Sequence, residues 1–150
     1  MAVRKDESRQ AVKRVVLDTN VVASACFWRG VCWQCLEAWV GGRFTALVSP
    51  ALLTEYTEVF ERLRQRYPDR PCVDWVAALR DDAELVFPAV KIPDAFKDLD
   101  DVVFAECAVA GEADCLVSGD KEYVQAAGDV RGIPVLSPAR FLEVLNAGRS

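Results

Sequence analysis

The 150-residue sequence contains no histidine. This absence excludes the mechanisms that need an imidazole, such as a Ser-His-Asp triad, a Cys-His pair or a zinc protease site. Long apolar runs are also absent, since charges interrupt every stretch before the roughly 20 residues that a membrane-spanning helix requires. The N-terminus lacks the apolar core of a signal peptide, and no low-complexity segment is present. The sequence therefore predicts a globular, cytoplasmic protein that does not contact a membrane.

Positive charge is scarce beyond the N-terminus. The net charge is −5, and residues 1–14 carry five basic and two acidic side chains (+3), which leaves −8 for the rest. Such an acidic body disfavours broad electrostatic binding of nucleic acid but can hold a cation. We expect residues 1–13 to form a polar, flexible tail and residues 14–150 to form a single domain.

Six cysteines are present, two of them as an isolated Cys32-x-x-Cys35. Zinc usually takes four nitrogen or sulfur ligands, which this pair cannot supply in a chain without histidine. The spacing fits one face of a helix together with Leu36 and Trp39. A structural role is therefore the preferred interpretation.

Short apolar runs alternate with longer amphipathic ones. The predicted strands are 14–18, 44–49, 84–87, 114–118 and 133–137. The predicted helices are 21–41 (broken near Arg29-Gly30), 50–67, 73–83, 98–110, 121–127 and 138–147. Ser49-Pro50 and Ser137-Pro138 are typical of helix starts. This alternation predicts an α/β fold, a three-layer α/β/α sandwich around a mainly parallel sheet of about five strands.

Acidic residues recur where strands end or helices begin. Asp18 closes the first strand, Glu55 lies at the border of the buried stripe of its helix, and Asp120 follows the fourth strand. Each has a simple alternative explanation as a helix cap or as an acid that stabilises a helix dipole.

The segment 97–120 contains the highest density of acids. Asp98, Asp100 and Asp101 stand together at the start of a predicted buried helix, where capping explains one or two of them. A third carboxylate is harder to explain, because like charges this close repel unless a cation neutralises them. Clusters of oxygen ligands suit hard cations such as Mg²⁺ or Mn²⁺. We therefore prefer a metal site to a set of unrelated caps.

Four motifs in this order resemble the PIN domain: LDTN, SPALLTEY, KDLDD and SGDKEY. The resemblance spans about residues 14–145 and is greatest to toxin components of toxin–antitoxin systems, the VapC-like ribonucleases. It implies a ribonuclease that uses one or two Mg²⁺ or Mn²⁺ ions. Lys97 and Leu99 stand where relatives often have Arg and Pro, and Ser118 stands where many have Thr.

Carried over by motif, the resemblance implies a catalytic, metal-binding set with polar supports and lysines nearby. The four acids are Asp18, Glu55, Asp101 and Asp120. Asp98 and Asp100 are additional ligands or supporting residues, Asn20 and Ser118 line the site, and Lys97 and Lys121 either contact phosphate or are simply solvated.

Two other functions are compatible with parts of the sequence. A haloacid-dehalogenase-like phosphatase also has an acid after its first strand, but it needs a second acid where this chain has Asn20. A non-catalytic PIN-like module that binds protein or RNA is the other alternative. Trp28, Trp33 and Trp39 exceed what one buried stripe requires, and this excess predicts a homodimer or antitoxin contact.

Overall fold

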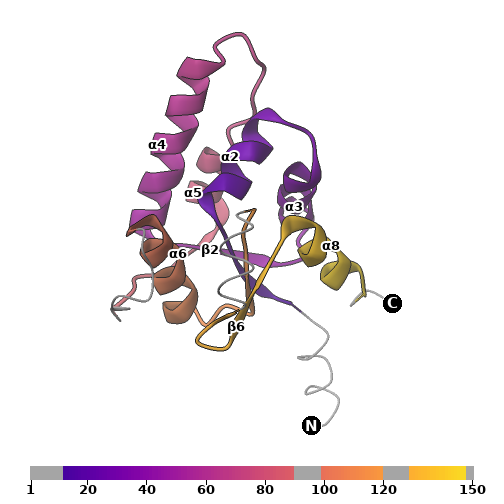
Figure 1. The fold of residues 1–150 in the computed structure, drawn as a ribbon, viewed down its shortest axis with the longest axis vertical. Helices are drawn as coiled ribbons and strands as arrows, with labels where there is room; N and C mark the ends of the chain where they lie inside the picture. The colour runs from indigo at the N-terminus through magenta and orange to yellow at the C-terminus, as the bar shows by residue number, and fades with distance from the viewer. Residues whose placement is uncertain (1–11, 90–98, 120–128, 148–150) are drawn as a thin grey trace.

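The computed structural model describes residues 12–89, 99–119 and 129–147, and within these it leaves out the side chains of residues 99–101. Its helices are drawn in Figure 1. They are α2 (Thr19–Phe27), α3 (Val31–Val40), α4 (Pro50–Arg66), α5 (Trp75–Asp82), α6 (Leu99–Ala110) and α8 (Pro138–Ala147). No helix in the described ranges has both the length and the apolar character needed to cross a bilayer.

Within the described ranges, six strands form one sheet: β1 (Arg14–Leu17), β2 (Thr45–Val48), β3 (Glu84–Leu85), β4 (Cys115–Val117), β5 (Asp129–Val130) and β6 (Ile133–Leu136). Their order is β3-β2-β1-β4-β6-β5, and every pairing is parallel except that of β5 with β6. The five predicted strands are confirmed, and the short β5 adds a sixth at the edge. β5 has only two residues and lies directly before a turn, so its sequence shows no recognisable strand pattern.

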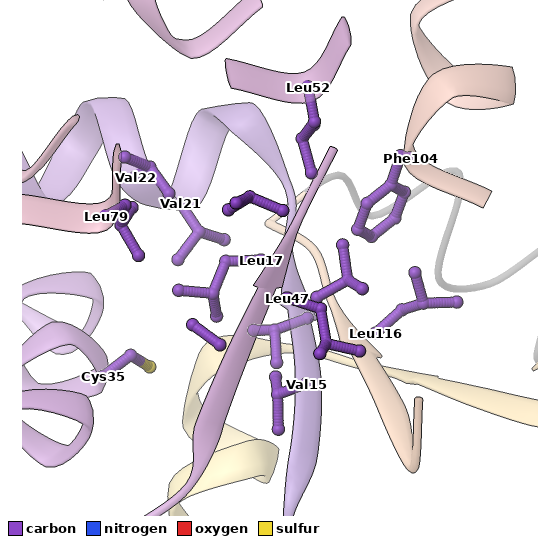
Figure 2. Packing of buried hydrophobic residues seen from close by; sticks show 14 of the residues in the cluster. Val15, Leu17, Val21, Val22, Cys35, Leu47, Leu52, Leu79, Phe104 and Leu116 are labelled. Carbon is purple, nitrogen blue, oxygen red and sulfur yellow. The ribbon is translucent and has the colours of Figure 1, made fainter. Parts of the chain in front are cut away.

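The central strand β1 is buried on both faces. Val15 and Val16 are fully buried and Leu17 is 1% exposed, although successive side chains of a strand point to opposite sides. Helices must therefore cover both faces of the sheet, which is the expected condition of a parallel sheet. Figure 2 shows Phe104 of α6 approaching the strands from the side opposite Val21. The predicted three-layer α/β/α arrangement is confirmed.

Helix boundaries follow local sequence signals. Ser49 caps α4, and its side chain accepts a hydrogen bond from the Leu52 N–H at 3.1 Å, with Pro50 in the first turn. The Ser137 hydroxyl accepts likewise from the Arg140 N–H. The predicted break near Arg29-Gly30 separates α2 from α3. These outcomes agree with the prediction, whereas the helix predicted at 121–127 lies outside the described residues, as does most of the predicted tail.

The Cys32-x-x-Cys35 pair lies in α3 as a packing feature. Cys35 and Leu36 are fully buried, and Cys32 and Trp39 pack partly against the same core. All six cysteines are free thiols. Burial raises the pKa of Cys35 to about 12. The packing of the pair against the core agrees with the structural interpretation.

Candidate active site at the carboxyl edge of the sheet

The strand order reverses beside β1, because β2 and β3 lie on one side of it and β4 and β6 on the other. In open α/β sheets, ligands bind outside the carboxyl ends of the strands at such a point. Asp18 follows β1 directly, and its backbone N–H donates to the Val117 carbonyl at the end of β4, at 2.8 Å. The two strand ends are thereby joined where the topology predicts a site.

Asp18 also begins helix α2. Its Oδ1 accepts a hydrogen bond from the Thr19 N–H at 2.7 Å. Its second oxygen, Oδ2, accepts from the Ser118 hydroxyl at 2.9 Å. The cap interpretation and the site interpretation are thus compatible, because Oδ1 performs the capping while Oδ2 faces the end of β4.

The buried polar residues share one location. Among the described residues these are Thr19, Ser49 and Ser118, at 4%, 1% and 0% exposure. Each lies within two residues of the carboxyl end of β1, β2 or β4. Burying a hydroxyl costs free energy unless it is hydrogen-bonded, so this concentration of polar groups marks the carboxyl edge as different from the rest of the core.

Glu55 reaches this edge from α4. It is half-buried, whereas Glu58 and Glu61 on the same helix are exposed, as the helical spacing predicts. The Thr19 hydroxyl donates a hydrogen bond to Glu55 Oε1. Thr19 therefore contacts both acids, through its N–H to Asp18 and through its hydroxyl to Glu55. Two carboxylates from separate elements are held around one small residue.

Tyr56 lies directly beneath these acids. It is 2% exposed, and its hydroxyl donates to the Leu17 carbonyl, the last of β1. Burial raises the pKa of Tyr56 well above its ordinary value, and the nearby carboxylates of Asp18 and Glu55 raise it further. The phenol stays neutral and fixes α4 against the end of β1, which positions Glu55 one residue away.

The remaining predicted site residues are only partly described. Asp100 and Asp101 lie in the first turn of α6, a helix that contacts both α4 and β1. Their side chains, and the whole of Lys97, Asp98, Asp120 and Lys121, lie outside the described residues. Asn20 is exposed in the first turn of α2, and its supporting role stays a prediction.

The donor chemistry fits a hard divalent cation. The two described acids offer carboxylate oxygens, with hydroxyls arranged behind them, and Mg²⁺ and Mn²⁺ prefer oxygen ligands. Within the described ranges no group of three or more acidic or cysteine side chains is assembled. This result is expected, because the other two predicted ligands, Asp101 and Asp120, contribute no described side chain.

Sequence reasoning missed Thr19 and Tyr56 as functional supports. Both adjoin a predicted acid, Thr19 after Asp18 and Tyr56 after Glu55. The available signal for Tyr56 was its place in the buried stripe, since a buried phenol needs a hydrogen-bond acceptor. Thr19 carried only a weak signal, because a threonine at a helix start is explained by capping alone.

Comparisons with known proteins agree with this geometry. The sequence matches the PIN domain over residues 14–122. No curated protein matches it significantly. Among solved structures, a PilT N-terminus domain protein from the hyperthermophilic archaeon Sulfolobus solfataricus P2 has a similar fold, with a TM-score of 0.55 and 12% identity over 91% of this chain and 94% of that one. The chain therefore belongs to the PIN domain family, whose members are generally nucleases.

Proposed function

We propose that this protein is a divalent-metal-dependent endoribonuclease, and that it acts as the toxin of a toxin–antitoxin pair. The observation that carries the proposal is the convergence of Asp18 and Glu55 on Thr19, at the point where the strand order reverses. If Asp18 and Glu55 served only unrelated helices, nothing would require both to contact the buried Thr19. Family membership supports a nuclease, and it sets the phosphatase alternative aside.

The described residues have distinct roles in this proposal. Asp18 and Glu55, together with Asp101 and Asp120, would hold one or two Mg²⁺ or Mn²⁺ ions. The Ser118 and Thr19 hydroxyls orient Asp18 and Glu55 by donating to one oxygen of each carboxylate. Such donors hold a ligand in position and tune its affinity for metal. The ion, when bound, would supply an activated water near neutral pH, which a chain without histidine otherwise lacks.

In the toxin role, the carboxyl edge of the sheet would also be the surface that the antitoxin binds. An antitoxin would bind over the acids and introduce a basic side chain among them, because a positive group can take the place of a cation. The support is the acidic character of the edge and the order of the four motifs. A PIN-like module that binds without cleaving is the second candidate, and the arginine-rich surface described below favours its RNA-binding form.

The test is cleavage of a panel of single-stranded and structured RNAs. We expect cleavage with Mg²⁺ or Mn²⁺, none with EDTA, and none with Asp18→Asn. Asparagine preserves the cap of α2, so circular dichroism should show an intact fold in the variant. Cleavage by Asp18→Asn at the wild-type rate would reject this assignment of the site. Tight binding of RNA by an intact wild type that cleaves no RNA of the panel would favour the binding module.

A further inference from the structure

A cluster of arginines and aromatic rings covers the end of the molecule that lies opposite to the starts of α2 and α4. We call it the arginine–aromatic surface; it comprises Trp28, Arg29, Arg64, Arg66, Tyr67 and Arg70. Trp28 follows α2, and Arg66 and Tyr67 close α4. Figure 1 shows these helix ends together at the top of the view, beside the connection that leads to α5.

Two of the four arginines of this surface, Arg66 and Arg70, contact its two rings. The guanidinium carbon of Arg70 lies 4.9 Å from the centroid of the Trp28 ring, and that of Arg66 lies 5.6 Å from the Tyr67 ring. The Trp28 and Tyr67 rings meet edge to face at 5.7 Å. Arg70 Nε also donates to the Phe27 carbonyl at 2.7 Å, which fixes its position. The surface is therefore preorganised.

The same surface is hollowed and accessible. An open depression of about 420 Å³ is lined by residues that include Phe27, Arg64, Tyr67 and Arg70. Trp28, a large apolar side chain, is 37% exposed. A flat ring exposed beside cationic groups can stack on a nucleobase, while the arginines contact the phosphates.

The local charge has the opposite sign to that of the whole chain. Residues 60–73 carry four arginines against Glu61 and Asp69, a net +2, and Arg29 adds one more to give +3, whereas the chain carries −5. An acidic protein that acts on a polyanion needs such a local region, because phosphate contacts dominate the affinity for nucleic acid.

We propose that the arginine–aromatic surface is a subsite for single-stranded RNA, with a base stacked on Trp28 and phosphates bound by Arg64 and Arg66. Its role as a substrate subsite rests on the proposed ribonuclease function. A contact between two copies of this surface is disfavoured, because a symmetric interface would place arginines against arginines. Of the three tryptophans that suggested a protein contact, Trp33 and Trp39 pack against the core, and only the exposed Trp28 is here assigned to RNA.

The position of the surface fits one strand that reaches both sites. Asp18 caps the start of α2 and Glu55 lies near the start of α4, and both helices end at the arginine–aromatic surface. The eleven residues from Glu55 to Arg66 correspond to about 17 Å of helix. A stacked strand rises about 3.4 Å per nucleotide along its axis, so about five nucleotides would bridge the acids and the surface.

The test measures binding separately from cleavage. Fluorescence anisotropy of a labelled, unstructured 12-nucleotide RNA is followed in EDTA, where the proposed nuclease is inactive, over a range of salt. The variants are Trp28→Ala and the double change Arg64→Gln, Arg66→Gln. The control is Arg131→Gln, Arg140→Gln, which removes the same charge from exposed positions elsewhere. This control also breaks the Arg140–Glu143 ion pair, which has the same i,i+3 spacing as the Arg64–Glu61 pair.

The expected results are specific to each variant. Loss of one stacked base should weaken binding by Trp28→Ala about 5- to 150-fold. Loss of two phosphate contacts should weaken binding by the Arg64, Arg66 variant and lower the slope of log K against log salt by about 1.4. The Arg131, Arg140 control should retain the wild-type slope. Circular dichroism checks that each variant is folded. If Trp28→Ala does not fold, the Arg64, Arg66 variant still tests the surface independently.

Three results would overturn the inference. These are no RNA binding by the wild type in EDTA, equal losses in the surface and control variants, or a Trp28→Ala change that turns a dimer into a monomer in sedimentation while leaving RNA affinity intact. The outcome is separable from that of the proposed function. RNA binding that depends on the arginine–aromatic surface, without metal-dependent cleavage, would support the subsite and reject the nuclease. Metal-dependent cleavage without such binding would support the nuclease and reject the subsite.

Discussion

The two edges of the sheet use the same residue types in different ways. At the amino edge, the Arg14 guanidinium makes two hydrogen bonds to Glu84, at 3.0 and 2.7 Å, and Asp114 accepts from the backbone N–H groups of Lys13 and Arg14. At the carboxyl edge, the hydrogen bonds to Asp18 and Glu55 include those from hydroxyls, which orient a carboxylate without adding positive charge.

The pKa values at the amino edge express this difference. The hydrogen bond and charge of Arg14 lower the pKa of Glu84, and Glu84 raises that of Arg14 in return. An acid neutralised in this way has little capacity left for a metal ion. A hydroxyl donor, in contrast, orients a carboxylate without neutralising it. The comparison indicates that the environment of a carboxylate, more than its presence at a strand end, separates a structural acid from a candidate ligand.

The largest expected effect separates two glutamates of one helix. Glu55→Gln should lower metal-dependent RNA cleavage by about 100-fold or more, since even loss of a group that supports a ligand costs 10–100-fold. Glu58→Gln, one turn closer to the C-terminus and exposed, should retain the wild-type rate. Initial rates at saturating Mg²⁺ or Mn²⁺ provide the measurement. Equal losses in both variants would show that helix charge matters rather than the site.

A smaller effect is expected at Ser118, which is fully buried. Ser118→Ala removes the hydroxyl that donates to Asp18 Oδ2 and should lower metal affinity or cleavage by about 10–100-fold. A titration of cleavage rate against Mn²⁺ should show a raised half-saturation concentration. Ser137→Ala is the matched control, because it removes a hydroxyl at the end of the neighbouring strand β6 that accepts from the Arg140 N–H of α8. An unchanged titration for Ser118→Ala would remove its assigned role.

Tyr56→Phe tests the coupling between α4 and β1. The change leaves the Leu17 carbonyl without the phenol hydroxyl, and a lost buried hydrogen bond costs about 1–2 kcal/mol of unfolding free energy. Because the pKa of Tyr56 is raised in the folded state, its contribution is complete below pH of about 10 and is lost as the pH rises above that value. Urea unfolding at pH 7 and at alkaline pH measures both effects. An identical pH dependence in Tyr56→Phe would contradict this explanation.

The smallest effect is expected at the amino edge. Glu84→Gln breaks an exposed ion pair, so it should lower the unfolding free energy by at most about 1 kcal/mol. The pKa of Glu84 is lowered from 4.5, and the contribution is therefore present above that pH and lost as the pH falls through the lowered value. Unfolding curves should differ from wild type more at pH 7 than at pH 3. Any loss of RNA cleavage would mean that the two edges are not functionally distinct.

The sequence predicted the sheet, and it placed Asp18 and Ser118 at strand ends, because these signals are local. Apolar runs marked five of the six described strands, and Ser49-Pro50 marked a helix start by its capping chemistry. The role of Thr19 could not be predicted, since it depends on α4 bringing Glu55 beside α2, a contact between residues 36 positions apart. The Arg14–Glu84 pair is similarly non-local, since it joins residues 70 positions apart.

The central claim is that the acids at the carboxyl edge bind a divalent cation. Isothermal titration of Mn²⁺ into the wild type, Asp18→Asn and Glu58→Gln tests it without depending on the choice of RNA. We expect Mn²⁺ to bind the wild type, to bind Asp18→Asn much more weakly or not at all, and to bind Glu58→Gln with wild-type affinity. Equal binding to all three proteins, or no binding to a folded wild type, would contradict it.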